Sequence, residues 1–161
     1  MPADNAKLLH ELLELQARER PDSPALWWQD RAISYAELYQ RVMKTAGRLA
    51  GSGAQGERVA VLAWNCPEFV ELIYAVPASG RILVPLNARL APAELSYMLG
   101  SSGATTLIAD DELLAGLSDQ EDFPEGIQTI GLQSDYAAWL GERTPTPLPS
   151  TSEDDPVWIL Y

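Results

Sequence analysis

Apolar residues recur along the first part of the chain with helical spacing. Leucines at positions 8, 12 and 15 lie four and three residues apart, as on the core-facing side of an amphipathic helix. We expect this helix to cover residues 5–19, with Asp4 or Asn5 as its N-cap. The pattern then changes, and residues 25–34 predict a small hairpin that turns at Asp30-Arg31.

A second helix is predicted to begin at Ser34. Ser34 and Glu37 have the spacing of a capping box, in which the hydroxyl and the carboxylate each accept a backbone amide of the first turn. Leu38, Val42 and Leu49 give this helix one apolar face. A glycine at position 51 or 53 is expected to end it.

Four short apolar runs follow, and their starts are 22 or 23 residues apart. The segments between them predict helices, two of which begin after a proline and stop at a glycine. Strands that alternate with helices imply βαβ units and a mainly parallel sheet covered on both faces, so the sequence predicts the α/β class. The expected strands are 59–63, 82–86, 105–109 and 127–130, and the expected helices are 68–79, 93–99 and 111–117.

The chain divides into three regions by composition. Residues 1–143 are expected to form one α/β unit. Residues 144–156 hold four prolines and the acidic run Glu153-Asp154-Asp155, which predicts an extended, solvated connector. Residues 157–161 are apolar and strand-like, although a chain end is usually polar. We therefore expect them to be the first strand of a following segment that has been cut off.

The composition, with 47% apolar and 21% charged residues, is that of one soluble globular domain. A formal net charge of −12 repels a phosphate backbone, which excludes nucleic acid as a partner. The charge is uneven, since residues 110–161 hold 12 acidic residues and one basic residue, Arg143. No apolar run approaches the ~18 residues of a membrane span, and the single cysteine excludes an internal disulfide, so a cytoplasmic protein is expected.

Two motifs have the spacing of chemically active sites. Residues 51–56 match the dinucleotide fingerprint G-x-G-x-x-G, but that fingerprint must follow a strand and open a helix, whereas this one follows a predicted helix. We expect a flexible turn there. Cys66 precedes a predicted helix, as activated thiols do, but His10 is the only histidine that could act as its base. We expect both side chains to be structural.

Two acidic clusters, at 110–112 and 153–155, have the ligand chemistry of Mg²⁺. Aspartate at a strand-to-helix junction is also an ordinary helix cap, so capping and solvation are the expected roles. The residues assemble no catalytic constellation and no metal centre. The remaining expectations are solvated side chains for Lys7 and Lys44, and core or hairpin packing for Trp27, Trp28 and Trp64.

Six segments follow one another in a characteristic order and spacing: Ile33-Ser34-Tyr35-Ala36-Glu37-Leu38, residues 58–69, Gly80-Arg81-Ile82-Leu83-Val84-Pro85-Leu86-Asn87, residues 87–90, residues 94–99 and residues 155–161. Together they resemble the N-terminal portion of the adenylate-forming superfamily of acyl-CoA synthetases, adenylation domains and luciferases. The likeness covers residues 25–161. Pro77, Ser79 and Arg81 depart from the small residue or lysine followed by Gly-Ala that the family often has.

The resemblance implies an activity for an intact family member. Such an enzyme couples a carboxylic acid to ATP, which gives an acyl-adenylate and pyrophosphate, and then transfers the acyl group to a thiol. Asn87 resembles the residue of acyl-CoA synthetases at this position and favours coenzyme A as the acceptor. ATP, Mg²⁺ and coenzyme A are therefore implied for a longer parent, an acid–CoA ligase of the fatty-acid–CoA ligase type.

The same resemblance places the family's phosphate loop and catalytic lysine beyond Tyr161. No residue of this chain is accordingly assigned as catalytic, cofactor-binding or metal-binding, and the 161-residue piece is expected to be inactive and to need no cofactor by itself. Two other classes stay open. One is a stand-alone interaction module that forms a homodimer or binds a partner through residues 157–161. The other is a small flavodoxin-like domain that binds a ligand near Trp64, Asn87 and Asp110.

Overall fold

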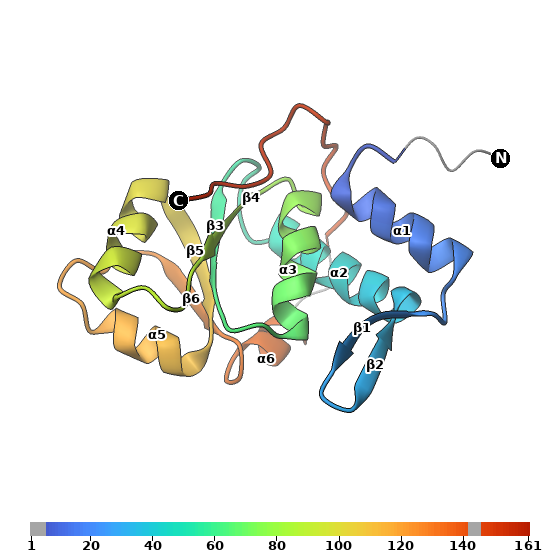
Figure 1. Cartoon of the computed structure of the whole chain (residues 1–161). Helices are drawn as coiled ribbons and strands as arrows, with labels where there is room; N and C mark the ends of the chain where they lie inside the picture. The colour runs from blue at the N-terminus through green and yellow to red at the C-terminus, as the bar shows by residue number, and fades with distance from the viewer. Residues whose placement is uncertain (1–5, 142–145) are drawn as a thin grey trace.

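Four parallel strands form the central sheet, in the order β4-β3-β5-β6 (Figure 1). The computed structural model describes residues 6–141 and 146–161. Each strand lies within one residue of an expected apolar run, and the predicted α/β class with a parallel sheet is confirmed. The strands are β3 (Arg58–Leu62), β4 (Ile82–Leu86), β5 (Ala104–Ala109) and β6 (Gln128–Gly131).

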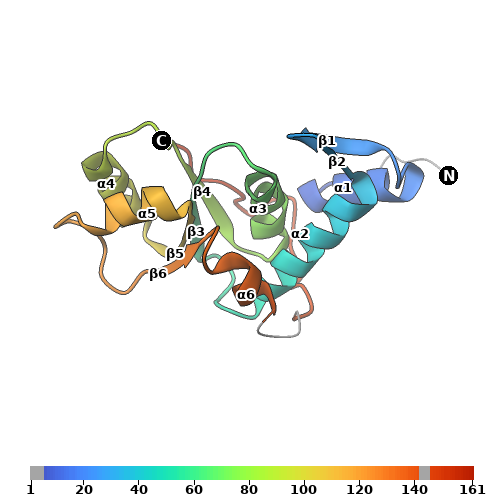
Figure 2. The same ribbon diagram turned by 90° about the horizontal axis from the view of Figure 1, so that it is seen from below.

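Helices cover both faces of this sheet (Figure 2). Successive side chains of a strand point to opposite faces, so Val59 and Val61 join one core cluster while Ala60 and Leu62 join the other. Both sets are apolar because neither face is open to water. The first face carries α2 (Tyr35–Ala50), α3 (Pro67–Ala78) and α6 (Tyr136–Gly141), and α1 (Leu9–Glu19) packs on the outside of α2 and α3. The second face carries α4 (Pro92–Ser102) and α5 (Asp111–Ser118).

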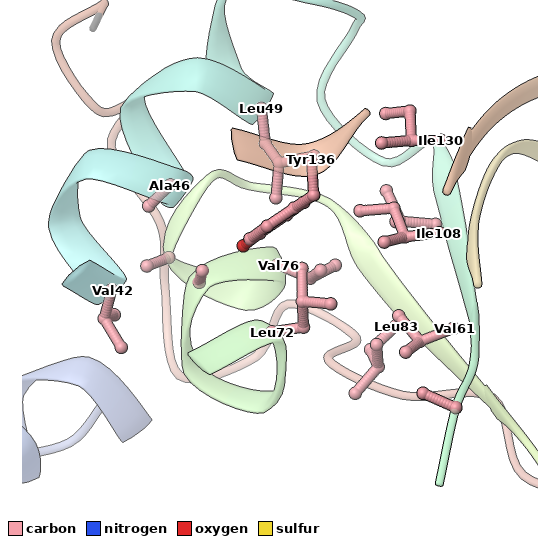
Figure 3. Packing of buried hydrophobic residues seen from close by; sticks show 14 of the residues in the cluster. Val42, Ala46, Leu49, Val61, Leu72, Val76, Leu83, Ile108, Ile130 and Tyr136 are labelled. Carbon is pink, nitrogen blue, oxygen red and sulfur yellow. The ribbon is translucent and has the colours of Figure 1, made fainter. Parts of the chain in front are cut away.

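The larger core lies between α2, α3, α6 and the sheet (Figure 3). Leu72 and Val76 of α3 point toward the strands and are fully buried. Val42 and Leu49 of α2 close the other side, as the apolar face of this helix predicted. Burial of each such side chain stabilises the fold by about 1.5–3 kcal/mol, so this layer holds the helical face on the sheet.

The expected capping box of α2 forms only in part. The amide of Glu37 donates to the Ser34 hydroxyl over 3.2 Å, as predicted. The Glu37 carboxylate pairs instead with Arg31 of the hairpin, at 2.5 Å. A charged partner within reach binds a carboxylate more strongly than a neutral amide does, which explains why the reciprocal half of the motif is absent from the described contacts.

The first helix differs from its prediction in both position and face. It begins at Leu9, not at residue 5, because the Glu11 carboxylate accepts the amides of Lys7 and Leu8 and so caps the helix there. Asp4 and Asn5 lie outside the described residues. Leu13 is the buried leucine and Leu12 is exposed, so the predicted stripe through position 12 is wrong. Leucines occupy both sides of this helix, and contact with α2 and α3 selects one of them.

Two other boundaries differ from the predictions. The fourth helix continues through Gly100 to Ser102, and the glycine that ends it is Gly103, which has a φ of +65°. Gly100 has helical geometry and open space around it, so nothing obliges the helix to stop there. The sixth helix, six residues long, has no predicted counterpart, because so short a segment contains less than two turns of apolar periodicity.

The predicted hairpin is confirmed. Strands β1 (Pro24–Trp28) and β2 (Arg31–Ser34) pair antiparallel. Trp27 and Trp28 lie on this hairpin, one of the two expected places for them, but their side chains are exposed. Trp64 is half exposed after β3, so none of the three tryptophans packs in the core. A two-stranded ribbon has no second layer that could bury side chains on both of its faces.

Residues 146–161 run back across the molecule toward the edge of the sheet (Figure 1). The amide of Thr146 donates to the Gly47 carbonyl over 3.0 Å, and Leu148 packs on the larger core. Residues 157–159 then lie parallel to β4, since Leu83 donates to the Val157 carbonyl and accepts from the Ile159 amide, each over 2.9 Å. The strand-like character expected of residues 157–161 thus corresponds to a short pairing at the sheet edge.

Candidate functional site

The carboxyl ends of the parallel strands meet at one edge of the sheet, where open α/β folds bind ligands. A cleft of about 290 Å³ opens between the ends of β3 and β4. Its walls are the segments that directly follow these two strands. The lining residues are Ala63, Trp64, Asn65, Phe69, Leu86, Asn87, Ala88 and Arg89.

The cleft offers binding groups rather than reactive ones. Trp64 and Phe69 present aromatic surface, and Arg89 adds a guanidinium. The Asn87 carboxamide oxygen accepts the amide of Arg89 over 3.0 Å, which fixes the turn that carries both side chains. Among the residues that the structure describes, the lining contains no acid, histidine, cysteine or serine. This arrangement suits a planar or anionic group but holds no base or nucleophile for a reaction.

Asp110 ties the cleft wall to the neighbouring strand ends. One carboxylate oxygen accepts the amide of Trp64 over 2.7 Å, and the other accepts the Gln133 side chain over 2.6 Å. Gln133 also exchanges two hydrogen bonds with Asp111, of 2.9 and 3.2 Å. These bonds connect the ends of β3, β5 and β6. Asp110 stands at the N-cap position of α5, but its side chain does not cap that helix, so the capping role expected for it is wrong.

The acidic residues do not fit a magnesium ion. The carboxylates of Asp110 and Asp111 are occupied by the hydrogen bonds just described, and Glu153 pairs with Lys7 over 2.9 Å. Asp155 accepts the Ser152 amide over 2.8 Å. Within residues 6–141 and 146–161, no group of three or more His, Cys, Asp or Glu side chains is arranged to hold a metal. We therefore derive no step through a metal held by this chain.

Cys66 lies before α3, as the sequence suggested, but its surroundings oppose activation. Burial raises the pKa of its thiol to about 11, and the charges of Glu68 and Asp110 add to the rise. His10 lies elsewhere, at the start of α1, where it lines a different cavity of about 220 Å³ with Arg81. The structure does not bring the two side chains together, so His10 is not placed to act as a base for Cys66.

The glycine motif at 51–56 joins α2 to β3 and packs over a buried charge. A Cβ atom at Gly53 would overlap the Arg81 guanidinium and the Glu57 carboxylate. Arg81 is 2% exposed, and its Nη2 lies 3.5 Å from Glu57. Burial lowers the pKa of Arg81, and Glu57 opposes that change. The motif therefore serves packing, and neither Arg81 nor Glu57 carried a signal in the sequence that pointed to this contact.

No helix in the described ranges is both long and apolar enough to cross a bilayer.

The comparisons with known proteins agree with this fold. The sequence profile of the family described as "AMP-binding enzyme" matches residues 13–161. The fatty acid–[acyl-carrier-protein] ligase ScoC of Streptomyces coeruleorubidus is 31% identical over 157 residues, which cover 95% of this chain and 30% of the ligase.

Two solved structures superimpose closely on the chain. A fatty acyl CoA synthetase of Mycobacterium tuberculosis has a TM-score of 0.85 and 28% identity, over 96% of this chain and 32% of that one. The N-terminal domain of FACL13 from the same organism has a TM-score of 0.85 and 29% identity, over 96% of this chain and 41% of that one.

The chain belongs to the AMP-binding, adenylate-forming enzyme family. The likeness to acyl-CoA synthetases expected from its motifs is thus confirmed, and its fold is that of the N-terminal domains of such enzymes. It spans less than half the length of each relative described above.

Proposed function

We propose that this chain serves an ATP-dependent ligase that joins a carboxylic acid to coenzyme A. The observation that carries the proposal is the family match across residues 13–161. The activity is that of a longer parent, in which residues 1–161 supply the parallel sheet, its helical layers and the wall of the cleft at Trp64, Asn87 and Arg89. A cytoplasmic location belongs to the proposal, because ATP and coenzyme A are available there.

Both steps of the proposed reaction develop negative charge, first on the phosphates and then on a tetrahedral carbon. Stabilisation of that charge requires positioned donors and cations. The chain has a net charge of −12, and in its described part Arg89 is the cation that lines the cleft. We therefore propose that residues 1–161 help to bind the substrate and shape the cleft but do not catalyse the reaction by themselves.

The thiol acceptor is the finer part of the proposal. Asn87 supports coenzyme A, and the fatty acyl CoA synthetase from Mycobacterium tuberculosis is named for the same acceptor. The ligase from Streptomyces coeruleorubidus is named for an acyl carrier protein instead. The acceptor assay must accordingly offer both thiols.

The reading frame of the gene tests the parent enzyme. The frame after Tyr161 is expected to continue into a loop rich in glycine, serine and threonine that contains a lysine. The encoded protein should then exchange pyrophosphate with ATP only when an acid is present, and should form a thioester with coenzyme A in preference to a carrier protein. A stop codon directly after Tyr161, or a frame without this loop, would refute the ligase and favour an interaction module.

The 161-residue chain is the subject of a second assay. Purified chain mixed with ATP, Mg²⁺ and a panel of carboxylic acids is expected to give no acid-dependent exchange of labelled pyrophosphate into ATP. Exchange above that of a heat-denatured sample would show that the chain is catalytic by itself.

A further inference from the structure

A buried acidic side chain lies between α2 and α3. Glu71 of α3 forms an ion pair with Arg41 of α2. Arg41 also reaches Glu68 at 3.1 Å and Glu37 at 3.8 Å. Arg31 of the hairpin in turn pairs with Glu37 at 2.5 Å. We call these five side chains the Arg41 network; it connects the hairpin, α2 and α3.

The charges of the Arg41 network do not balance when every group is ionised. Three carboxylates then face two guanidinium groups, and one added proton makes the network neutral. The side chain of Glu71 is 2% exposed, whereas those of Glu68 and Glu37 are 32% and 34% exposed. Because burial penalises the charged form of a carboxyl group, Glu71 is the member that takes the proton at least cost.

Within residues 6–141 and 146–161, Arg41 is the cation that acts on Glu71. Tyr136 of α6 is buried, and its hydroxyl shares a 3.1 Å hydrogen bond with Thr45 of α2. Burial raises the pKa of Tyr136, and the charge of Glu71 raises it further, so this phenol faces the same carboxylate. Helix α1 packs across α2 and α3. Burial raises the pKa of Tyr39 of α2, and the charge of Glu14 of α1 raises it further.

Burial raises the pKa of Glu71 to about 7, Glu68 and Glu37 add to the rise, and Arg41 opposes it. This direction agrees with the geometric argument from exposure and charge. The ordinary pKa of glutamate is 4.5. Between that pH and about 7, Glu71 therefore keeps its proton in the folded chain and loses it in the unfolded chain.

We propose that the Arg41 network is a pH-responsive joint, in which Glu71 takes up a proton as pH falls toward neutrality and thereby strengthens the packing of α3 on α2 and their tie to the hairpin. The device resides in the fold and is independent of the ligase activity proposed above.

The sign of the effect follows from proton linkage. Between pH 4.5 and about 7 the folded chain binds more protons than the unfolded chain, because the pKa of Glu71 is raised only in the folded state. The stabilisation from Glu71 is therefore complete below pH 4.5 and is lost as pH rises through about 7. One such group changes the folding equilibrium constant by at most about tenfold per pH unit.

Urea unfolding of the whole 161-residue chain, followed by circular dichroism between about pH 5 and about pH 8, tests the proposal. The fall in stability with rising pH is expected for the unchanged chain and should be lost in Glu71→Gln. Glu68→Gln, a matched change on the same helix, should keep the fall but move it to lower pH, because it removes a negative neighbour of Glu71. An equal slope in Glu71→Gln and the unchanged chain would overturn the proposal.

A second measurement does not depend on the folding of any variant. Glutamate labelled with ¹³C at the side-chain carboxyl is followed by NMR in the unchanged chain. One resonance is expected to titrate near pH 7, well above the others. If every glutamate carboxyl titrates near its ordinary value of 4.5, the joint does not exist.

Discussion

Gly53 and Arg81 occupy one small volume beneath the loop that joins α2 to β3. The guanidinium fills the space that a side chain at Gly53 would need, and within the described ranges no group accepts a hydrogen bond from its three nitrogens. Glu57 is the charge that faces it, at 3.5 Å. A buried charge with a single ion-pair partner carries a large desolvation cost. The fold must therefore keep the loop at residues 51–56 closely packed over Arg81.

The substitution Gly53→Ala is expected to destabilise the chain by about 1–3 kcal/mol, the usual cost of overpacking a filled space. Gly100→Ala is the matched control, because Gly100 lies within α4 with open space around it. There an alanine should stabilise by about 0.5–1 kcal/mol through its higher helix propensity. Urea denaturation of both variants measures the two effects. A neutral Gly53→Ala would show that the loop moves aside freely.

Boundaries between elements depended on contacts that no local pattern contains. The helix after β4 was expected to end at Gly100, yet the glycine with left-handed backbone lies three residues later. The segment 157–159 was recognised from its apolar character, but its partner, Leu83 of β4, is set by the sheet. The helix α2 was predicted well because its apolar face recurs with helical spacing, and the four strands were predicted well because burial on both faces makes each of them a continuous apolar run.

The pairing of residues 157–159 with β4 predicts a pattern of hydrogen exchange. The amide of Ile159 is bonded to the Leu83 carbonyl, and its side chain packs on the core of the second face. The amides on either side, of Trp158 and Leu160, point to the open edge by the alternation of a strand. Exchange followed by NMR should be at least about tenfold slower at Ile159 than at Leu160. Equal rates at these two residues would mean that the segment does not pair.

At the scale of the whole molecule, the last third of the chain holds both the net negative charge and an exposed apolar edge. Most of the net charge of −12 follows Ala109, while the edge beside β4 exposes large apolar side chains. Those of residues 157–161 lie next to backbone groups that can still pair, and sheet edges of this kind promote association. The acidic run at 153–155 directly precedes the same edge, so electrostatic repulsion between copies of the chain should oppose their association.

Self-association is therefore expected to depend on both concentration and salt. Sedimentation velocity at high protein concentration should reveal larger species, and added salt should increase them by screening the repulsion. Leu160→Glu, at a position that is 70% exposed on the edge, should abolish the effect. Leu12→Glu, which adds the same charge at a leucine that is 48% exposed on α1, should not. A chain that stays monomeric under all these conditions contradicts the prediction.

The sequence by itself determined the α/β class, the positions of the four strands and the family of the chain. These follow from hydrophobic periodicity and from motifs that are local in the chain. Only the tertiary structure decided which side of α1 is buried, where Asp110 directs its carboxylate, and that Arg81 lies under Gly53 and Glu71 beside Arg41. Each of these depends on groups that are distant in sequence, and the cost or gain of burying a charge is known only when its neighbours in space are known.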